Sequence, residues 1–149
     1  MRAVVQRVIK SNVSVDNNII GEIKEGIMLL LGVEENDRDE DFEYIFKKVT
    51  NLRIFDDENG VMNKTIKDIN GELLVISQFT LYGDARKGNR PSYVKAAKFE
   101  NGKMYYEKFI LKATELGIKT QHGEYGADMQ VQLINNGPVT ILLDSSRIF

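Results

Sequence analysis

The beginning of the chain alternates between hydrophobic and polar residues, as strands do when they bury one face. Segments 3–9, 13–15 and 19–23 follow this pattern, and Asp16-Asn17-Asn18 lies between two of them as a tight turn. The run 27–33 is almost continuously apolar, which is typical of a strand at the centre of a sheet. The pattern therefore predicts a meander of short antiparallel strands.

Two later stretches change to the period of about 3.6 residues that amphipathic helices show. We expect Asp37 to cap the first helix, with Glu40 as the second half of a capping box. The apolar stripe of this helix consists of Phe42, Ile45, Phe46, Val49 and Leu52. We expect Asn101 to cap the second helix and Gly117 to stop it, because glycine readily adopts the positive φ of a helix end.

The remaining segments predict further strands. Residues 73–79 form a second buried strand, which ends in polar side chains. Residues 129–134 alternate, 135–138 are expected to turn and 139–143 to return, which predicts a long hairpin. Together the elements predict an α/β (α+β) fold, in which two helices pack against a mainly antiparallel sheet, as a single domain spanning residues 1–149.

Composition narrows the class of protein. The chain has 42% hydrophobic and 28% charged residues, which is typical of a globular domain. It contains no cysteine, so disulfides and thiolate chemistry are excluded, and we expect a cytoplasmic setting. The longest apolar run, residues 27–31, is far shorter than the roughly 20 residues that span a bilayer, so no membrane partner is expected.

The formal net charge of −2 conceals an uneven distribution. Residues 34–43 contain seven acidic residues and one basic residue, whereas residues 83–120 contain nine basic and four acidic residues. The basic stretch is either a solvated lysine-rich helix or a local surface that faces phosphates. The sequence leaves both interpretations open.

The chain offers few groups for acid–base or metal chemistry. His122 is the single histidine, and it lies beside a glycine in a predicted loop. No zinc-binding, phosphate-loop or nucleophile-elbow motif is present. The sequence therefore argues against a metalloenzyme and a histidine-activated triad, and it predicts neither a metal nor a cofactor. A hydrolase of this composition needs an unusual base or one that the substrate supplies.

Two segments place small polar groups at the ends of apolar strands. In Ser77-Gln78-Phe79-Thr80-Leu81-Tyr82, strand alternation would put Gln78 and Thr80 on one face. They are either the incidental end of a strand or the rim of a site for a polar ligand. In Asn136-Gly137-Pro138-Val139-Thr140, the proline indicates a turn or a sheet edge. This segment is either a simple hairpin turn or, with a cis bond before Pro138, a functional element.

Together the two segments resemble the paired signature of the D-aminoacyl-tRNA deacylase family, and the resemblance covers the whole chain. Further matching segments are Gln6-Arg7-Val8, Leu31-Gly32-Val33, Asn51-Leu52-Arg53-Ile54-Phe55, Gly88-Asn89-Arg90-Pro91-Ser92-Tyr93 and Gly123-Glu124-Tyr125-Gly126-Ala127-Asp128-Met129. Asn136 stands where the family commonly has Asp, and Tyr125 where it commonly has Phe.

The resemblance implies a homodimer with a closed, barrel-like β arrangement and a site at the dimer interface. The residues implied to hold the aminoacyl group and the terminal adenosine are Ser77, Gln78, Phe79 and Thr80. Gly137 and Pro138 of one subunit, joined by a cis bond, would enter the partner's pocket as the selectivity element. Arg7 and Met129 would brace this pair.

The implied activity is hydrolysis of the ester between tRNA and a D-amino acid or glycine, with L-aminoacyl-tRNA rejected. We expect the tRNA itself to be bound through Lys87 and Arg90 of the basic stretch. Because this ester is already activated, a positioned water and backbone N–H groups around Phe79 and Thr80 would suffice. The 2′-hydroxyl of the terminal ribose could help to activate the water, or Thr80 could act as the nucleophile.

Two functions from other classes stay open beside this one. The first is a non-catalytic dimeric module that binds nucleic acid through the basic stretch. The second is a general hydrolase of small esters. Neither alternative accounts for the paired signature segments.

Overall fold

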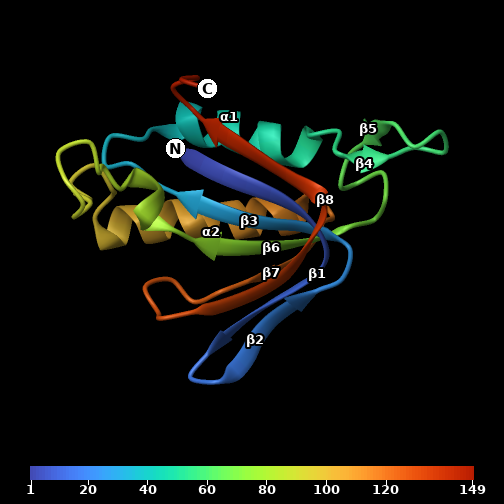
Figure 1. The fold of residues 1–149 in the computed structure, drawn as a ribbon, viewed down its shortest axis with the longest axis horizontal. Helices are drawn as coiled ribbons and strands as arrows, with labels where there is room; N and C mark the ends of the chain where they lie inside the picture. Colours follow the sequence, from blue (N-terminus) through green and yellow to red (C-terminus); the bar gives the residue numbers. More distant parts are fainter.

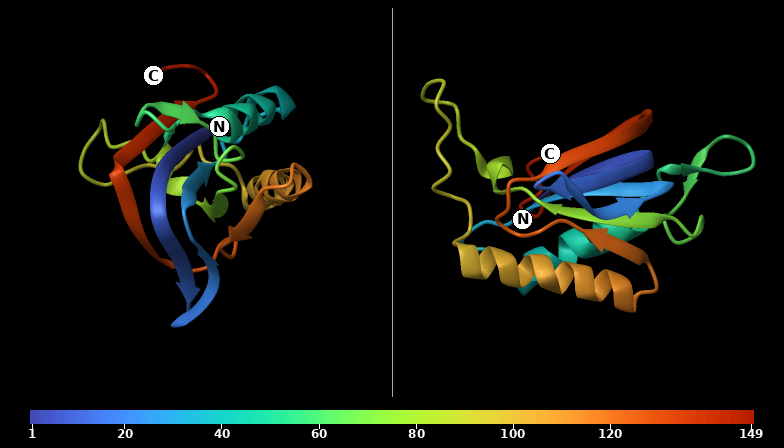
Figure 2. Two further views of the ribbon diagram at one scale, coloured as in Figure 1. Left: turned by 90° about the vertical axis from the view of Figure 1, so that its right-hand side faces the viewer. Right: turned by 90° about the horizontal axis from the view of Figure 1, so that it is seen from below.

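The computed structural model describes all residues from Met1 to Phe149. Two helices, α1 (Asp39–Asn51) and α2 (Phe99–Glu115), lie on the same side of a strongly curved six-stranded sheet (Figures 1 and 2). The strands of the sheet are β1 (Arg2–Val15), β2 (Asn18–Ile23), β3 (Gly26–Gly32), β6 (Glu72–Ser77), β7 (Lys119–His122) and β8 (Gln130–Asp144). Their order is β2-β1-β3-β6-β7, with β8 paired to β1. A small ribbon of β4 (Phe55–Asp56) and β5 (Met62–Lys64) stands apart.

The sheet nearly closes on itself, in agreement with the barrel-like arrangement that the family resemblance implied. A Cβ added at Gly21 of β2 would lie 2.9 Å from the carbonyl oxygen of His122 in β7. The two ends of the strand path therefore approach each other, and only a residue without a side chain fits at this contact.

The predicted hairpin over residues 129–143 is wrong, because β8 is one continuous strand that pairs with β1 instead of with itself. The antiparallel ladder runs from Ser14 opposite Gln130 to Arg2 opposite Asp144, with irregularities on either side of Val8. The predicted turn at 135–138 is a bulge at this point. Likewise, the separate strands predicted over 3–9 and 13–15 form the single strand β1. The predicted meander is also wrong, because β3 pairs with β1 and not with β2.

The sheet is mixed, since β3 pairs with β6 and β6 pairs with β7 in parallel. Helix α1 lies between β3 and β6 in the chain, and α2 lies between β6 and β7, so each crossover returns the chain in the same direction. Leu31 of β3 is opposite Ser77 of β6. The carboxyl ends of these two strands therefore meet at one edge, which is where open α/β sheets commonly bind ligands.

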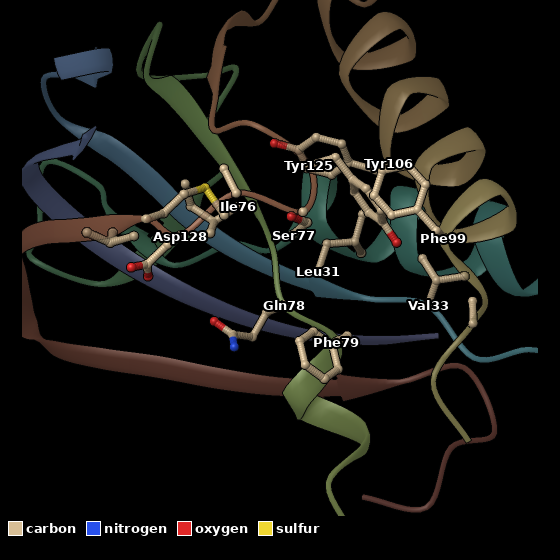
Figure 3. A pocket seen from close by; sticks show the side chains of 15 residues that line it. Leu31, Val33, Ile76, Ser77, Gln78, Phe79, Phe99, Tyr106, Tyr125 and Asp128 are labelled. Atoms are coloured by element: carbon tan, nitrogen blue, oxygen red, sulfur yellow. The ribbon is translucent and has the colours of Figure 1, made fainter. Parts of the chain in front are cut away.

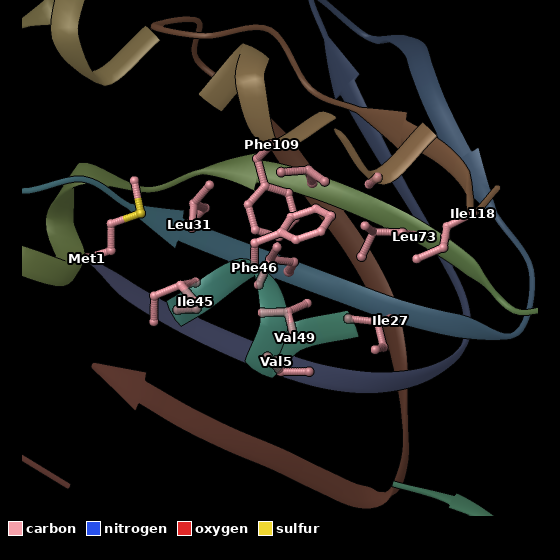
Figure 4. Packing of buried hydrophobic residues seen from close by; sticks show 14 of the residues in the cluster. Met1, Val5, Ile27, Leu31, Ile45, Phe46, Val49, Leu73, Phe109 and Ile118 are labelled. Carbon is pink, nitrogen blue, oxygen red and sulfur yellow. The ribbon is translucent and has the colours of Figure 1, made fainter. Parts of the chain in front are cut away.

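The main core fills the space between the sheet and the helices (Figure 4). Four of the five residues predicted for the stripe of α1 are buried there, namely Phe42, Ile45, Phe46 and Val49, whereas Leu52 follows the end of the helix and is half-buried. Phe109 of α2 meets Phe46 edge to face, with 5.1 Å between ring centroids. The helices are thus fixed to the sheet by aromatic packing.

Both predicted helix caps are wrong. Helix α1 begins after Arg38, whose N–H donates to the Asp41 carboxylate at 3.0 Å. Asp37, predicted to be the cap, instead accepts hydrogen bonds from the amino group of Met1 at 2.5 Å and from the N–H of Glu34 at 2.6 Å. Helix α2 begins at Phe99 after Lys98 as its cap, so Asn101, predicted to be the cap, lies in its first turn. Its predicted end is confirmed at Gly117, which has a φ of +86°.

Candidate active site

A cavity of about 470 Å³ opens at the carboxyl ends of β3 and β6 (Figure 3). Its lining is mostly apolar and consists of Leu31, Val33, Ile76, Ser77, Gln78, Phe79, Ala97, Phe99, Tyr106, Tyr125, Gly126, Ala127, Asp128, Met129 and Val131. A mostly apolar hollow with a few polar groups at one rim is the usual form of a small-molecule site.

Three of the predicted catalytic residues, Ser77, Gln78 and Phe79, line this cavity. The N–H of Gln78 donates to the carbonyl of Leu31 at 2.8 Å and ends the parallel ladder. The chain then turns into η1 (Phe79–Tyr82), a 3-10 helix. The strand alternation expected over 77–82 is therefore wrong beyond Gln78.

Thr80 lies at the rim and not in the lining of the cavity. Its Oγ1 accepts a hydrogen bond from the side-chain amide of Gln78, so the two polar residues still meet. The first N–H groups of a helix have no partner within it, which leaves the amides of Phe79 and Thr80 available to a ligand. No carboxylate or histidine is hydrogen-bonded to the Thr80 hydroxyl.

An aromatic wall, formed by Phe99, Tyr106 and Tyr125, closes one side of the cavity. The Tyr125 ring lies 5.1 Å from the Phe99 ring and 5.5 Å from the Tyr106 ring, centroid to centroid. The Tyr106 hydroxyl donates to the carbonyl of Val75 at 2.9 Å. Burial raises the pKa of both Tyr106 and Tyr125, so both phenols stay protonated near neutral pH.

The wall fits only because α2 has a glycine at position 102. A Cβ added at Gly102 would lie 2.0 Å from the Tyr125 hydroxyl oxygen. Sequence reasoning did not select these three aromatic residues as part of the site. Aromatic residues at this spacing are equally typical of a hydrophobic core, so the sequence pattern did not distinguish site residues from core residues.

Asp128 supplies the only carboxylate in the lining of the cavity. In Figure 3 it lies with Gln78 on the side away from Phe99 and Tyr106. Sequence reasoning also missed this role, although Asp128 is part of a segment that resembles the family. Met129 follows it in the lining, and its sulfur packs so close to Gly123 that a Cβ there would lie 2.5 Å away.

Gly137 and Pro138 lie in the bulge of β8 and are exposed, away from the cavity lining of their own chain. The peptide bond between them is cis, and Gly137 has a φ of +119°. Arg7 stands beneath them, only 8% exposed, and donates from Nε to the carbonyl of Asn136 at 3.1 Å. The structure thus brings Arg7 to this pair, whereas Met129 lies in the cavity.

Lys87 and Arg90 lie on an exposed loop that projects from one end of the molecule (Figure 2). An isolated β-bridge between Asp84 and Ser92 closes the base of the loop. Neither cation has a carboxylate within 4 Å. Beside the loop, Tyr93 packs edge to face on Phe79 with 5.1 Å between centroids, and both rings are exposed.

The basic stretch 83–120 divides into two parts with different properties. On α2 the lysines are paired with acidic residues, for example Lys108 with Asp39 at 2.7 Å and Lys103 with Glu107 at 3.7 Å. The solvated-helix interpretation therefore holds for α2. Only the loop before it carries cations that are free to meet phosphates.

Other chemistry is not evident around the cavity. No group of three or more His, Cys, Asp or Glu residues is placed to hold a metal ion. His122 is exposed at the end of β7, outside the cavity lining. None of the helices has the length and apolar character that a bilayer crossing requires.

Comparison with known proteins identifies the family of the chain. The family model described as D-Tyr-tRNA(Tyr) deacylase matches residues 4–144. The chain belongs to the D-Tyr-tRNA(Tyr) deacylase family. The chain is 53% identical to the "D-aminoacyl-tRNA deacylase" of Thermosipho africanus and 55% identical to that of Clostridium novyi, with all of both chains covered in each case. The family expected from the sequence is confirmed.

Solved structures agree with the fold. A structure named "c-Myc DNA Unwinding Element Binding Protein" is 38% identical, has a TM-score of 0.90 and matches 97% of this chain and 98% of its own. Another, described as a probable eukaryotic D-amino acid tRNA deacylase, has a TM-score of 0.81 at 15% identity and covers 96% of this chain and 98% of its own. The predicted α/β (α+β) fold with two helices is therefore the fold of the family.

Proposed function

We propose that the cavity binds the 3′ end of a D-aminoacyl-tRNA and hydrolyses its ester, so that the chain is a D-aminoacyl-tRNA deacylase. One observation carries the proposal. Ser77, Gln78 and Phe79 form the polar mouth of the cavity in a chain that is 53–55% identical, over its full length, to proteins named for this activity. A tRNA substrate also favours a cytoplasmic site of action.

The catalytic step that fits the site relies on positioning and on the substrate. An aminoacyl ester needs a placed water and donors for the developing oxyanion, and the first amides of η1 can act as those donors. Neither phenol of the cavity can serve as a general base, because burial holds both protonated, and His122 lies outside the lining. The one carboxylate of the lining, that of Asp128, fits the ammonium group of the substrate instead. We therefore assign activation of the water to the 2′-hydroxyl of the terminal ribose. Thr80, which accepts a hydrogen bond from Gln78, would orient the groups of the substrate at the rim of the cavity.

Asp128 fits the recognition of the substrate's α-ammonium group. It is the single carboxylate in the lining, and an ammonium ion in a mostly apolar cavity needs an opposite charge. Because every aminoacyl-tRNA carries this ammonium, such a contact would position the ester without selecting the side chain. It would therefore suit an enzyme that accepts many D-amino acids.

Chiral selection is assigned to Gly137 and Pro138 of a partner subunit in a homodimer. Both residues are exposed outside the cavity of their own chain, so a contact with substrate requires a second chain. The outer face around them is apolar and uncovered, since Ile9, Ile134 and Leu142 are 52%, 45% and 54% exposed. Main-chain carbonyls in that position would exclude an L side chain and leave glycine unhindered.

The free cations of the projecting loop support a contact with tRNA. Lys87 and Arg90 are exposed and unpaired, and the exposed aromatic pair Phe79–Tyr93 lies between the cavity and this loop. Basic groups beside aromatic rings are typical of surfaces that bind single-stranded nucleic acid. The unpaired 3′ end of a tRNA has the chemistry that such a surface recognises.

The nucleic-acid-binding alternative is favoured by one observation, the name of the solved relative at 38% identity. One experiment separates it, and the small-ester alternative, from the proposed function. The purified protein is incubated with D-Tyr-tRNA and with D-tyrosine methyl ester, and tRNA binding is followed in parallel. The proposal expects rapid release of D-tyrosine from tRNA only. Binding of tRNA without release of D-tyrosine would support the non-catalytic nucleic-acid-binding module. Hydrolysis of both the tRNA ester and the methyl ester would support a general esterase.

A further inference from the structure

A second concave surface, which we name the α1 cleft, lies on the side of the molecule away from the projecting loop. It measures about 400 Å³ and is lined by Tyr44, Lys47, Lys48, Asn51, Leu52 and Arg53. These residues belong to the second half of α1 and to the turn that leads to β4. None of them was predicted to bind substrate, although Leu52 was expected in the apolar stripe of α1 and Asn51, Leu52 and Arg53 lie in a segment that resembles the family.

The cations of the α1 cleft have no acidic partners. Lys47, Lys48 and Arg53 are exposed, and none has a carboxylate within 4 Å, unlike the lysines of α2. A fourth cation, Arg147 near the end of the chain, lies 5.1 Å from the Tyr44 ring centroid, and the Lys48 ammonium lies 5.6 Å from the same centroid. Several cations thus converge on one hollow with an aromatic side chain in its lining.

The helix end does not neutralise these charges. The carbonyls of a helix C-terminus carry partial negative charge and attract cations when they are free. Of the last four carbonyls of α1, that of Lys48 accepts from the Leu52 N–H at 3.0 Å, and no hydrogen bond joins the head group of Lys47, Lys48 or Arg53 to any of the four. The lysine and arginine heads are therefore left to bind an anion from outside.

The cleft is connected to the proposed selectivity element by a short chain of contacts. Arg53 precedes Ile54, whose carbonyl accepts from Arg7 Nη1 at 2.7 Å. The same guanidinium holds the carbonyl of Asn136, next to Gly137. If Gly137 and Pro138 reach into the partner's cavity, the cleft of their own chain is carried to the edge of that cavity.

From this placement we propose that the α1 cleft binds phosphates in the acceptor stem of the tRNA whose 3′ end occupies the partner subunit's cavity. The inference rests on the proposed function, because it needs the dimer and the tRNA substrate. Lys47, Lys48 and Arg53 make the main phosphate contacts, and Arg147 borders them. The substrate then spans both subunits, with its 3′ end on one and its stem on the other.

The first test compares a triple variant with a matched control. Lys47→Ala/Lys48→Ala/Arg53→Ala removes three unpaired cations, and Lys103→Ala/Lys108→Ala/Lys112→Ala removes three paired ones. Each is assayed on D-Tyr-tRNA at several salt concentrations and on 3′-O-D-tyrosyl-adenosine, which has no phosphate. Binding of uncharged tRNA is measured by fluorescence anisotropy, so that a result is obtained even without turnover.

For the cleft variant we expect KM and Kd for tRNA to rise about tenfold or more at low salt, with kcat unchanged. Each phosphate contact contributes about 0.7–0.9 to the logarithmic salt slope, so losing two or three contacts should flatten it by about two. Cleavage of the adenosine ester should match that of the wild type. Unchanged tRNA binding and salt slope would overturn the inference while leaving the deacylase activity intact. Loss of adenosine-ester cleavage would also overturn it, because the change would then act on the cavity. A wild-type protein that binds tRNA through the cleft but cleaves neither substrate would instead defeat the proposed function.

A second test asks which subunit supplies the cleft. Heterodimers are prepared from differently tagged chains, using Ser77→Trp to fill one cavity. In the first heterodimer, one chain carries both Ser77→Trp and the triple cleft substitution, and the other chain is wild type. The intact cavity then faces a partner without a functional cleft, and the KM for tRNA should be high. In the second heterodimer, one chain carries Ser77→Trp and the other carries the triple cleft substitution. The unfilled cavity then faces a partner with an intact cleft, and the KM for tRNA should be that of the wild type. The opposite pattern would show that the cleft serves its own subunit and would contradict the proposal.

Discussion

Arg7 on β1 donates from its Nε to the carbonyl oxygen of Asn136 on β8 at 3.1 Å, at the point where the long ladder between these strands is interrupted. Its Nη1 donates to the carbonyl of Ile54 at 2.7 Å. A nearly buried guanidinium therefore fixes the bulge that carries Gly137 and Pro138. The bulge is held by directional hydrogen bonds and not by the ladder.

We expect Arg7→Lys to keep the fold and to lose activity. Lysine retains the charge but cannot donate in two fixed directions at once. A hydrogen bond from a charged group contributes about 1.5–3 kcal/mol, and about 1.4 kcal/mol corresponds to a tenfold change. kcat/KM for D-Tyr-tRNA should therefore fall at least about tenfold, with a circular dichroism spectrum like that of the wild type. Full activity in Arg7→Lys would show that the bulge needs no such support.

Thr80→Ala separates the two catalytic routes. If the 2′-hydroxyl activates the water, the variant should keep activity within about tenfold of the wild type. A D-aminoacyl-tRNA that ends in 2′-deoxyadenosine should lose about 100-fold or more, as expected for removal of a general acid–base group. Single-turnover rates measure both effects on the chemical step. A severe loss in Thr80→Ala, with normal cleavage of the deoxy substrate, would make the threonine the nucleophile.

Asp128→Asn should weaken substrate binding and leave the fold unchanged. The substitution removes the negative charge and nearly preserves the shape, so we expect KM for D-Tyr-tRNA to rise about tenfold with a smaller effect on kcat. N-acetyl-D-Tyr-tRNA lacks the ammonium group and serves as the control. It should be cleaved equally by the variant and by the wild type. Equal KM values of the two proteins for D-Tyr-tRNA would exclude the ammonium contact.

The pH dependence of the rate should not arise from histidine. Histidine is the residue type that most often serves as an acid or base near neutral pH, and the single histidine of the chain, His122, lies outside the cavity. Burial raises the pKa of Tyr106 and of Tyr125, so neither loses its proton near neutral pH. His122→Asn should therefore give a pH–rate profile between pH 5.5 and about 8.5 that superimposes on the wild-type profile. Loss of an inflection of the wild-type profile in the variant would assign the histidine a catalytic role.

The sequence predicted the parts of the fold that are set locally. The stripe of α1, the end of α2 at Gly117 and the buried strands β3 and β6 all follow from periodicity or from glycine. The long hairpin over 129–143 was wrong because pairing of β8 with β1 depends on residues more than a hundred positions apart. A Gly-Pro pair in an alternating segment looks the same locally whether it turns the chain or forms a bulge.

For the site, the sequence located the mouth of the cavity but not its walls. The end of the apolar strand drew attention to Ser77 and Gln78, and the family resemblance assigned them to the site together with Phe79. Tyr106 and Phe99 were missed, since aromatic residues on a helix are equally typical of a core. Asp128 was missed because only the fold brings its loop to the ends of β3 and β6. The unpaired state of Lys47, Lys48 and Arg53 likewise depends on where distant acidic residues lie.

Chiral discrimination on one tRNA tests the account most directly. The purified protein is incubated side by side with D-Tyr-tRNA and L-Tyr-tRNA, and with a Gly-tRNA, and the remaining ester is followed over time. Exclusion of the L side chain by main-chain carbonyls predicts cleavage of the D ester, measurable cleavage of the glycyl ester and none of the L ester. Comparable cleavage of the D and L esters, or a glycyl ester as stable as the L ester, would contradict it.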